Sequence, residues 1–431
     1  MLHDILLTAY GELHQFTIQQ IVEDLLMAVQ FDTGNTGFML IATSLVMLMT
    51  PGLAFFYGGL VGRKNVLTIM IQSFASMAIV DIIWFTVGYS LCFSGGEGAI
   101  IGNLDNAFLQ GIDLHSAYGA GSIPMFVFIV YQMMFAIITP ALITGAFANR
   151  VRFEAYLIFI VVWLLFVYFP FVHMVWGNGL LAQWGVRDFA GGITVHATAG
   201  FAALASIAYV GKRKVKDHGP HSIPLVALGT GLLWFGWYGF NAGSELRVDE
   251  VTSLAFLNTD LSASVAAVTW LAIAWVVEKK PKFLGLLTGS IAGLATITPC
   301  AGFVTPPSAM IIGFIASICC YYAINLVKKM KLDDALDVWG VHGVGGCIGT
   351  ILLGIFGTQA VNSSGFNGVL YGGGWGFLGK QIVAVAGASV YAFVFTYLML
   401  RIINLITPVK VSFAHQEKGL DESLHGESAY L

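Results

Sequence analysis

Apolar segments long enough to cross a membrane recur along almost the whole chain. A membrane-spanning helix needs about 20 mostly apolar residues, because the hydrocarbon core of a bilayer is about 30 Å thick. Only 10% of the 431 residues are charged, against roughly 25% in an average soluble domain. We therefore predict an all-α polytopic membrane protein with eleven transmembrane helices, of which the short, glycine-rich tenth is the weakest candidate. The segments are 36–60, 69–92, 124–148, 153–175, 190–210, 222–242, 259–277, 284–303, 308–327, 341–357 and 378–406.

Basic residues follow the odd-numbered segments, which orients the chain. After the even-numbered segments come only Arg187, Arg247 and Lys380, the last of these at the very start of the eleventh segment. Because Lys and Arg are enriched in cytoplasmic loops, the N-terminus is predicted outside and the C-terminus inside. Residues 1–33 would then be an external extension, 34–406 the membrane domain and 407–431 a cytoplasmic tail. Fourteen of the 20 basic residues follow odd-numbered segments: Arg63, Lys64, Arg150, Arg152, Lys212, Arg213, Lys214, Lys216, Lys279, Lys280, Lys282, Lys328, Lys329 and Lys331.

Two histidines lie inside predicted spans, His196 in the fifth and His342 in the tenth. An ionisable residue at bilayer depth is costly and usually marks a substrate or proton path. Five is an odd number, so a second set of five spans must enter the membrane from the side opposite to the first. Two such sets have the topology of an inverted repeat. Such repeats place substrate sites at the repeat interface near the midplane. We therefore expect the two histidines, each near an aspartate (Asp188, Asp337) and several glycines, to meet there.

Paired intramembrane histidines allow more than one role. Two neutral imidazoles can share one hydrogen bond and still present a nitrogen to a substrate, which suits proton relay. A packing role and a metal site are alternatives, although no further His, Cys or carboxylate cluster completes a coordination sphere. No Walker-type phosphate loop is present, so nothing indicates ATP as an energy source. We expect no cofactor, no metal and no nucleic-acid partner.

Aromatic side chains lie near the outer ends of other predicted spans. Phe135 is in the third span, Trp176 ends the fourth, and Trp237 and Phe240 precede Ser244 at the end of the sixth. A single tryptophan at that depth is usually part of the aromatic belt. Together these residues make a candidate substrate-binding group, in which we include Trp237.

Several motifs together resemble the ammonium transporter family (Amt/Mep, related to the Rh proteins). The resemblance covers about nine tenths of the chain, from about residue 34 to the C-terminus. The combination is highly specific for that family. The matching stretches are PGLAFFYGG at 51–59, AFANRVRF at 146–153, HMVW at 173–176, DFAGG at 188–192 with His196, GWYGFNAGS at 236–244, DVWGVHG at 337–343 and GLDESLHGESAY at 419–430.

The resemblance implies an eleven-helix protomer with an inverted 5+5 repeat and a long final helix, assembled as a homotrimer with one pore per subunit. The cell (inner) membrane is the default location for such a protein. By residue match, Trp176, Phe135 and Ser244 would form an external ammonium-recognition site, which Asp188 supports by ordering backbone. Phe135 and Phe240 would be stacked gating rings, with His196 and His342 below them. The tail resembles the segment through which PII-type regulatory proteins block these transporters of nitrogen uptake.

Ion energetics indicate how such a pore would select ammonium. Moving a small cation into a low-dielectric medium costs on the order of 20 kcal/mol by an idealised estimate, whereas a desolvated cation–π contact returns up to about 2 kcal/mol. Ammonium can escape this cost by giving up its proton, and potassium cannot. If the proton crosses along the histidine pair, transport is electrogenic, which we favour. If the proton returns outside, transport is neutral.

The sequence departs from the family at two positions that bear on transport. Asp81 lies inside the second span, where relatives commonly have a small or apolar residue, and could be a further proton- or cation-handling group or a structural anchor. Tyr131 stands where many relatives carry Phe. Rival functions are a neutral gas channel, an ammonium sensor that signals through its tail, and a membrane enzyme with metal on the His pair. We do not expect an enzyme.

Overall fold

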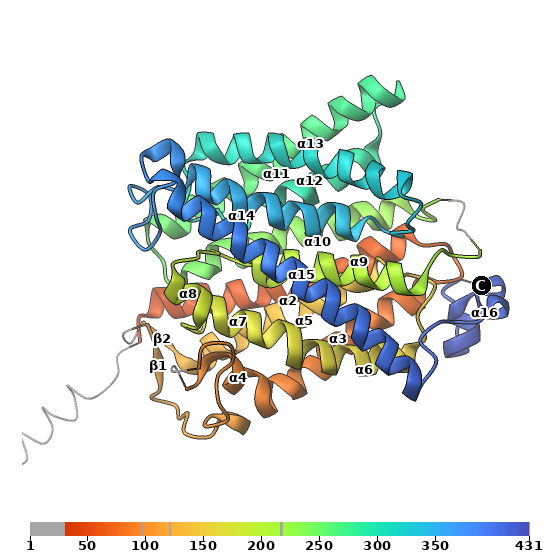
Figure 1. Cartoon of the computed structure of the whole chain (residues 1–431), viewed down its shortest axis with the longest axis horizontal. Helices are drawn as coiled ribbons and strands as arrows, with labels where there is room; N and C mark the ends of the chain where they lie inside the picture. Colours follow the sequence, from red (N-terminus) through yellow and green to blue (C-terminus); the bar gives the residue numbers. More distant parts are fainter. Residues whose placement is uncertain (1–30, 96–97, 120–121, 216–218, 431) are drawn as a thin grey trace, which may run out of the picture.

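The computed structural model describes residues 31–95, 98–119, 122–215 and 219–430, so almost all of the predicted extension at 1–33 lies outside the described residues. The described chain is a bundle of long helices that lie side by side along one axis (Figure 1). Its first half consists of α2 (Thr33–Leu60), α3 (Val66–Ile83), η1 (Trp84–Gly88), α4 (Tyr89–Phe93), α5 (Met125–Thr144), α6 (Phe153–Trp163), η3 (Leu164–Tyr168), α7 (Phe169–Val175), η4 (Gly192–Ala197) and α9 (Thr198–Val210).

The second half repeats this order of elements. It consists of α10 (Ile223–Ala242), α11 (Glu250–Glu278), α12 (Phe283–Ile297), α13 (Pro306–Lys329), η6 (Trp339–Gly343) and α14 (Val344–Phe356). A final helix, α15 (Gly374–Ile406), lies diagonally across the bundle (Figure 1). The smaller elements are η2 (Ala107–Leu109), β1 (Ala117–Tyr118) paired antiparallel with β2 (Ile123–Pro124), α8 (Leu180–Trp184), η5 (Gly243–Glu245), η7 (Val369–Tyr371), α16 (Phe413–Lys418) and η8 (Asp421–His425).

Ten helical segments of the described chain are long and apolar enough to cross a membrane, and each coincides with a predicted span. The remaining prediction, 284–303, corresponds to α12, which has only 15 residues. At 1.5 Å per residue such a helix is about 22 Å long, less than the hydrocarbon core. The total of eleven spans thus stays a prediction that depends on α12. The segment that we expected to be weakest, near 341–357, is instead part of an 18-residue helical segment, Trp339–Phe356.

Buried turns continue two of the helices in corresponding positions of the halves. After α5, residues 145–150 form turns, and after α12, residues 298–303 do the same. Both runs are buried inside the protein. Non-helical backbone at membrane depth is tolerated only where protein or a cavity surrounds it, so these turns extend the chain toward the bundle ends without exposing polar groups to lipid.

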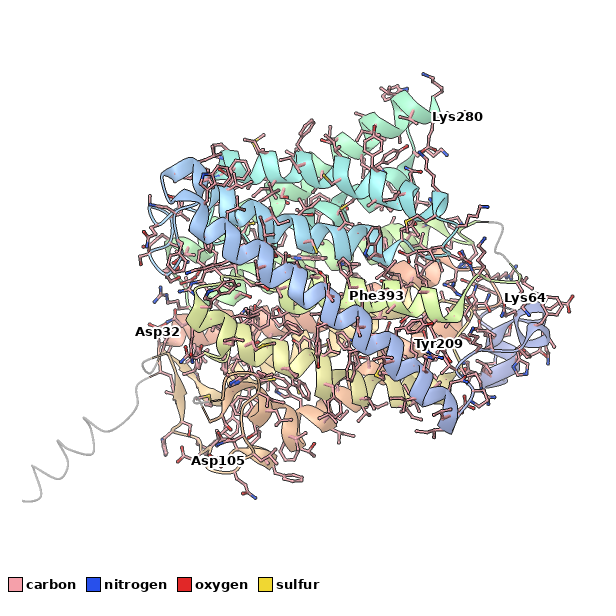
Figure 2. All side chains as sticks on the ribbon, viewed as in Figure 1. Asp32, Lys64, Asp105, Tyr209, Lys280 and Phe393 are labelled. Carbon is pink, nitrogen blue, oxygen red and sulfur yellow. The ribbon has the colours of Figure 1, made fainter. Side chains whose placement is uncertain are left out.

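The basic loops and the end of the chain lie at one end of the bundle, which we call the tail end. Figure 2 places Lys64 and Lys280 there, and Asp32 and Asp105 at the opposite end. The tail packs closely: Val151 and Lys410 form a β-bridge. The Asp421 carboxylate accepts hydrogen bonds from the Thr68 backbone N–H at 2.7 Å and the Leu67 N–H at 3.0 Å, which caps the start of α3. Which side of the membrane the tail end faces stays a prediction.

The two halves meet at the helices that carry the histidines. α9 and α14 run in opposite directions (Figure 1), and each is preceded directly by a π-helical turn, η4 or η6. A Cβ atom at Gly346 would lie 2.6 Å from the carbonyl oxygen of Gly192 and 2.7 Å from the Cβ of His196. Only glycine permits this approach of helix backbones, and the approach brings the two histidines together.

Candidate functional site

Three cavities follow one another through the protein. The outer cavity, about 330 Å³, is lined by Phe135, Trp176 and Ser244. The narrow cavity, about 20 Å³, is lined by Phe240, Trp237, both histidines and other apolar side chains. The inner cavity, about 230 Å³, is lined by Tyr57, Arg213 and Asp337, and it shares His342, Phe56 and Ile291 with the narrow cavity. The three cavities thus bring Trp176, Phe135, Ser244, Asp188, Trp237, Phe240, His196 and His342 along one path, whereas Asp81 and Tyr131 line none of them.

The outer cavity places two aromatic rings and a hydroxyl near one another. The rings of Phe135 and Trp176 meet edge to face with centroids 5.8 Å apart. The indole Nε1–H of Trp176 donates to the carbonyl oxygen of Asp188 at 2.8 Å, which fixes the ring. The Ser244 hydroxyl donates to the carbonyl oxygen of Phe240 at 2.8 Å. Because a hydroxyl has two acceptor lone pairs, the Ser244 oxygen can still accept a hydrogen from a cation.

Two phenylalanine rings separate the outer cavity from the narrow one. The centroids of Phe135 and Phe240 lie 4.2 Å apart with an interplanar angle of 35°. Each side chain is only 1% exposed. Since Phe135 lines the outer cavity and Phe240 the narrow one, a molecule that moves between the cavities must displace or pass these rings.

His196 and His342 form a buried pair beyond the phenylalanines. Their Nδ1 atoms are 3.2 Å apart, and the ring centroids are 5.2 Å apart at an angle of 24°. One Nδ1 must donate and the other accept. The Nε2 atom of His196 is buried and has no hydrogen-bond partner among the described residues. A buried polar atom without a partner requires an explanation, such as a ligand that binds there.

Asp188 positions His196 rather than offering a free charge to the outer cavity. Its Oδ1 accepts from the backbone N–H groups of Gly191 (2.8 Å) and Gly192 (2.6 Å). Its Oδ2 accepts from those of Ile193 (2.7 Å) and Thr194 (3.2 Å). These are the N–H groups that the start of a helix leaves without partners. Both carboxylate oxygens are therefore engaged in capping η4, the turn that carries His196.

Asp334, and not the predicted Asp337, occupies the corresponding position before His342. Asp334 precedes His342 by eight residues, as Asp188 precedes His196. Its Oδ1 accepts from Val338 N–H at 3.1 Å and its Oδ2 from Trp339 N–H at 2.8 Å. The equal spacing of eight residues between aspartate and histidine in the two halves is the sequence pattern that identifies Asp334. Burial, followed by the nearby charge of Asp337, raises the pKa of Asp334 to about 7.

The raised pKa of Asp334 predicts that the protein loses stability as pH rises. In the unfolded chain this carboxyl loses its proton near pH 4, whereas the folded protein keeps it to about pH 7. Between these values the folded state binds more protons, so its stability falls with rising pH. We expect the apparent melting temperature in detergent to fall between about pH 5 and 7, and Asp334→Asn to reduce that slope. Asp333→Asn is the matched control. Burial alone would raise the pKa of Asp333, but Arg213 outweighs burial and lowers that pKa, so this variant should not reduce the slope. An unchanged slope in Asp334→Asn would contradict the assignment.

Three of the predicted site residues do not line the outer cavity. Trp237 is beyond the phenylalanine pair, where its ring centroid is 5.6 Å from that of His196 and it lines the narrow cavity. Tyr131 is fully buried, and its hydroxyl contacts the carbonyl oxygens of Gly239 (2.9 Å) and Phe240 (3.0 Å). Tyr131 thus anchors α10, and its hydroxyl also lies 3.2 Å from the hydroxyl of Ser244, which it contacts from behind the outer cavity. Asp81 lines none of these three cavities, although its buried Oδ1 has no partner among the described residues.

Comparison with known proteins identifies the family. The model of the Ammonium Transporter Family matches residues 37–430. An ammonium transporter of Bacillus subtilis is 45% identical over 399 residues, which cover 92% of this chain and 98% of that protein. Ammonium transporter Amt1 of Archaeoglobus fulgidus is 42% identical over 400 residues, with coverage of 92% and 99%.

Solved structures agree with the sequence comparison. The crystal structure of Mep2 from Saccharomyces cerevisiae matches with a TM-score of 0.83 at 34% identity, covering 90% of this chain and 92% of that one. A structure described as a sensor Amt protein matches with a TM-score of 0.83 at 30% identity, covering 91% and 98%. This multi-pass membrane protein is a transporter rather than an enzyme, and it belongs to the ammonium transporter family.

Proposed function

We propose that this transporter binds ammonium in the outer cavity, removes its proton and passes neutral ammonia through the narrow cavity. The observation that carries the proposal is the buried Nε2 of His196, which lacks a hydrogen-bond partner among the described residues. It belongs to a residue that lines a cavity of about 20 Å³. A cavity of 10–15 Å³ on this measure holds roughly one water-sized molecule, and ammonia has that size.

The outer cavity suits a cation, and the narrow one suits a neutral molecule. Trp176 and Phe135 line the outer cavity with aromatic rings, and Ser244, which carries a hydroxyl group, lines it as well. Each cation–π contact contributes up to about 2 kcal/mol, far less than the idealised cost, on the order of 20 kcal/mol, of moving the cation into a dry apolar medium. Among the described residues, no carboxylate lines the narrow cavity. Ammonium that sheds its proton avoids this cost, whereas potassium is excluded.

The proton would cross by the histidine pair. With 3.2 Å between the two Nδ1 atoms, a proton taken up by one imidazole can pass to the other through their shared hydrogen bond. His342 also lines the inner cavity, which provides an exit toward the tail end. Transport would then be electrogenic. A proton that returned to the outer cavity would instead make the protein a neutral ammonia channel.

The tail end is assigned to the cytoplasm, on the basis of its basic loops. We propose a homotrimer, and a PII-type protein as the partner of residues 407–431, because both follow from the resemblance. The outer cavity then faces outside, where Trp176, Phe135 and Ser244 would meet ammonium first. A sensor role is a second candidate. It is motivated by the similarity to a sensor Amt protein and by the close packing of the tail on α3.

The direct test is current from proteoliposomes on a solid-supported membrane after an ammonium concentration jump. We expect a current in the wild type that a potassium jump does not produce. The double variant His196→Ala/His342→Ala should lose the current or its selectivity, while His115→Ala, on an exposed loop, should keep both. An ammonia-sensitive dye response inside the vesicles without any current would support the neutral channel. The absence of both a current and a dye response would favour the sensor role.

A further inference from the structure

Gln381 is a buried amide side chain on the last helix, outside the two repeated halves. The helix α15 begins at the end of the bundle opposite the tail (Figure 1), and Gln381 lies seven residues after its first residue. Gln381 is 0% exposed and lines none of the three cavities described above. Burying a polar amide is costly unless its polar atoms find partners, so the partners of Gln381 indicate its role.

The Gln381 amide pairs with both backbone groups of Arg187. Its Oε1 accepts from the Arg187 N–H at 2.9 Å, and its Nε2 donates to the Arg187 carbonyl oxygen at 2.8 Å. The second Nε2 hydrogen is donated to the carbonyl oxygen of Thr350, on α14, at 3.3 Å. Turning the amide over would place N–H against N–H and oxygen against oxygen. One orientation of the side chain therefore engages all of its polar atoms.

Arg187 directly precedes Asp188, whose carbonyl oxygen holds the Trp176 ring. The Trp176 Nε1–H donates to that oxygen at 2.8 Å. The N–H of the same peptide group donates to the carbonyl oxygen of Pro299 at 3.2 Å. Gln381 fixes the two peptide groups that come before it in the chain. Three successive peptide groups are thus held in place, and the Trp176 ring is held with them.

The Arg187 side chain also depends on the position of this backbone. Arg187 lines the outer cavity, where another cation is proposed to bind, and like charges repel each other. Its Nε donates to the carbonyl oxygen of Ser364 at 2.9 Å, and its Nη1 to that of Val186 at 2.9 Å. The guanidinium carbon lies 4.7 Å from the ring centroid of Phe366. These contacts direct the charge of Arg187 toward the loop after α14.

We infer that Gln381 is a positioning residue of the ammonium site. By holding the Arg187 backbone, it keeps the Trp176 ring in place at the outer cavity and the Arg187 guanidinium turned toward the neighbouring loop. The inference rests on the proposed role of Trp176 in binding ammonium. Without the amide, the Arg187 N–H and carbonyl oxygen would lose these partners, and the segment would rearrange to find others.

Fluorine NMR tests the position of the Trp176 ring without reference to transport. The protein would be labelled with 5-fluorotryptophan, and the Trp176 signal identified by its absence from Trp176→Phe. Gln381→Met keeps a long unbranched side chain and loses both bonds to Arg187. We expect the Trp176 signal to shift or broaden in Gln381→Met, whereas the signal of Trp275, which is 57% exposed near the end of α11, stays in place. An unmoved Trp176 signal would overturn the inference.

Two further variants complete the NMR test. Ser389→Ala is the matched control, because Ser389 is 4% exposed on α15 and donates to a carbonyl oxygen of the same helix at 2.7 Å. Its Trp176 signal should match that of the wild type, and a shift as large as in Gln381→Met would contradict the inference. If Gln381→Met does not fold, Gln381→Glu takes its place. A carboxylate still accepts from the Arg187 N–H but cannot donate to the carbonyl oxygen, so we expect a shifted Trp176 signal there too, and an unmoved one would overturn the inference.

The kinetic test separates positioning from a general loss of stability. In Gln381→Met we expect the ammonium concentration for half-maximal current to rise about fivefold, because a displaced ring keeps part of its cation–π contact, with a smaller change in maximal current. A residue that only stabilised the fold would lower the melting temperature and the maximal current at an unchanged half-saturating concentration, and that result would overturn the inference. A wild type without current would contradict the proposed transport mechanism and leave the NMR result intact.

Discussion

Replacement of Asp188 by alanine should lower the ammonium-driven current at least about 100-fold, because several buried N–H groups would lose their acceptor at once. Each unsatisfied buried donor costs roughly 1–3 kcal/mol, and the Asp188 carboxylate accepts four such bonds. The start of η4 would rearrange to find new partners. His196 lies on that turn, so its Nδ1 would leave the position from which it contacts His342.

The asparagine variant separates capping from direct binding of ammonium. Asp188→Asn keeps one acceptor oxygen, so we expect a residual current between those of the wild type and the alanine variant, with a lowered apparent melting temperature. If the carboxylate were instead a ligand of the cation, Asp188→Asn would raise the half-saturating ammonium concentration without lowering the melting temperature. Current traces and thermal unfolding of the same preparations decide between the two.

Much of the fold could be predicted because the bilayer imposes simple rules on a sequence. Span length and apolar composition are local properties, and they located ten of the spans directly. The case of α12 was different: its helix is short because turns at 298–303 replace its last part, and burial among neighbouring helices supports those turns. Such support comes from tertiary contacts, which no window of the sequence contains.

The candidate site was predictable where a residue's chemistry is unusual for its depth. His196 and His342 were such residues, and they form the expected pair. The choice between Asp334 and Asp337 was not settled by proximity in sequence. The backbone of η6 turns so that Asp334, four residues before Val338, accepts the N–H groups of Val338 and Trp339. Comparing the spacing in the two halves would have found it.

The location of Trp237 also depended on tertiary structure. The sequence places Trp237 and Phe240 less than one helical turn apart, so both were expected near the outer end of the span. The phenylalanine pair lies between the two cavities, and Trp237, which precedes Phe240 on α10, lies on the far side of it from the outer cavity. A difference of three residues, about 4.5 Å along a helix, is enough to change the cavity that a side chain lines.

Gly200→Ala should abolish the histidine contact and most of the selective current. A Cβ atom at Gly200 would lie 2.1 Å from the Cα and 2.2 Å from the backbone nitrogen of Gly343. Backbone atoms cannot move aside as the end of a flexible side chain can, so α9 and η6 must separate by about an ångström or more to restore ordinary contact distances. Gly343 follows His342 directly, so the 3.2 Å between the Nδ1 atoms would exceed hydrogen-bond range.

Gly231→Ala is the matched control, because the same added methyl group meets nothing within 4 Å on α10. Alanine favours a helix over glycine by about 1 kcal/mol, so this variant should keep its current and melt at the same or a higher temperature. The two variants are thus expected to differ in the sign of their effect on stability. If Gly200→Ala kept the current and stability of the wild type, the prediction would be contradicted, because the backbones of α9 and η6 could not then be as close as the Gly200–Gly343 contact indicates. A potassium current in Gly200→Ala would have a different meaning. The close approach of α9 and η6, which brings the histidines together, would then also keep the pore too narrow for a hydrated cation.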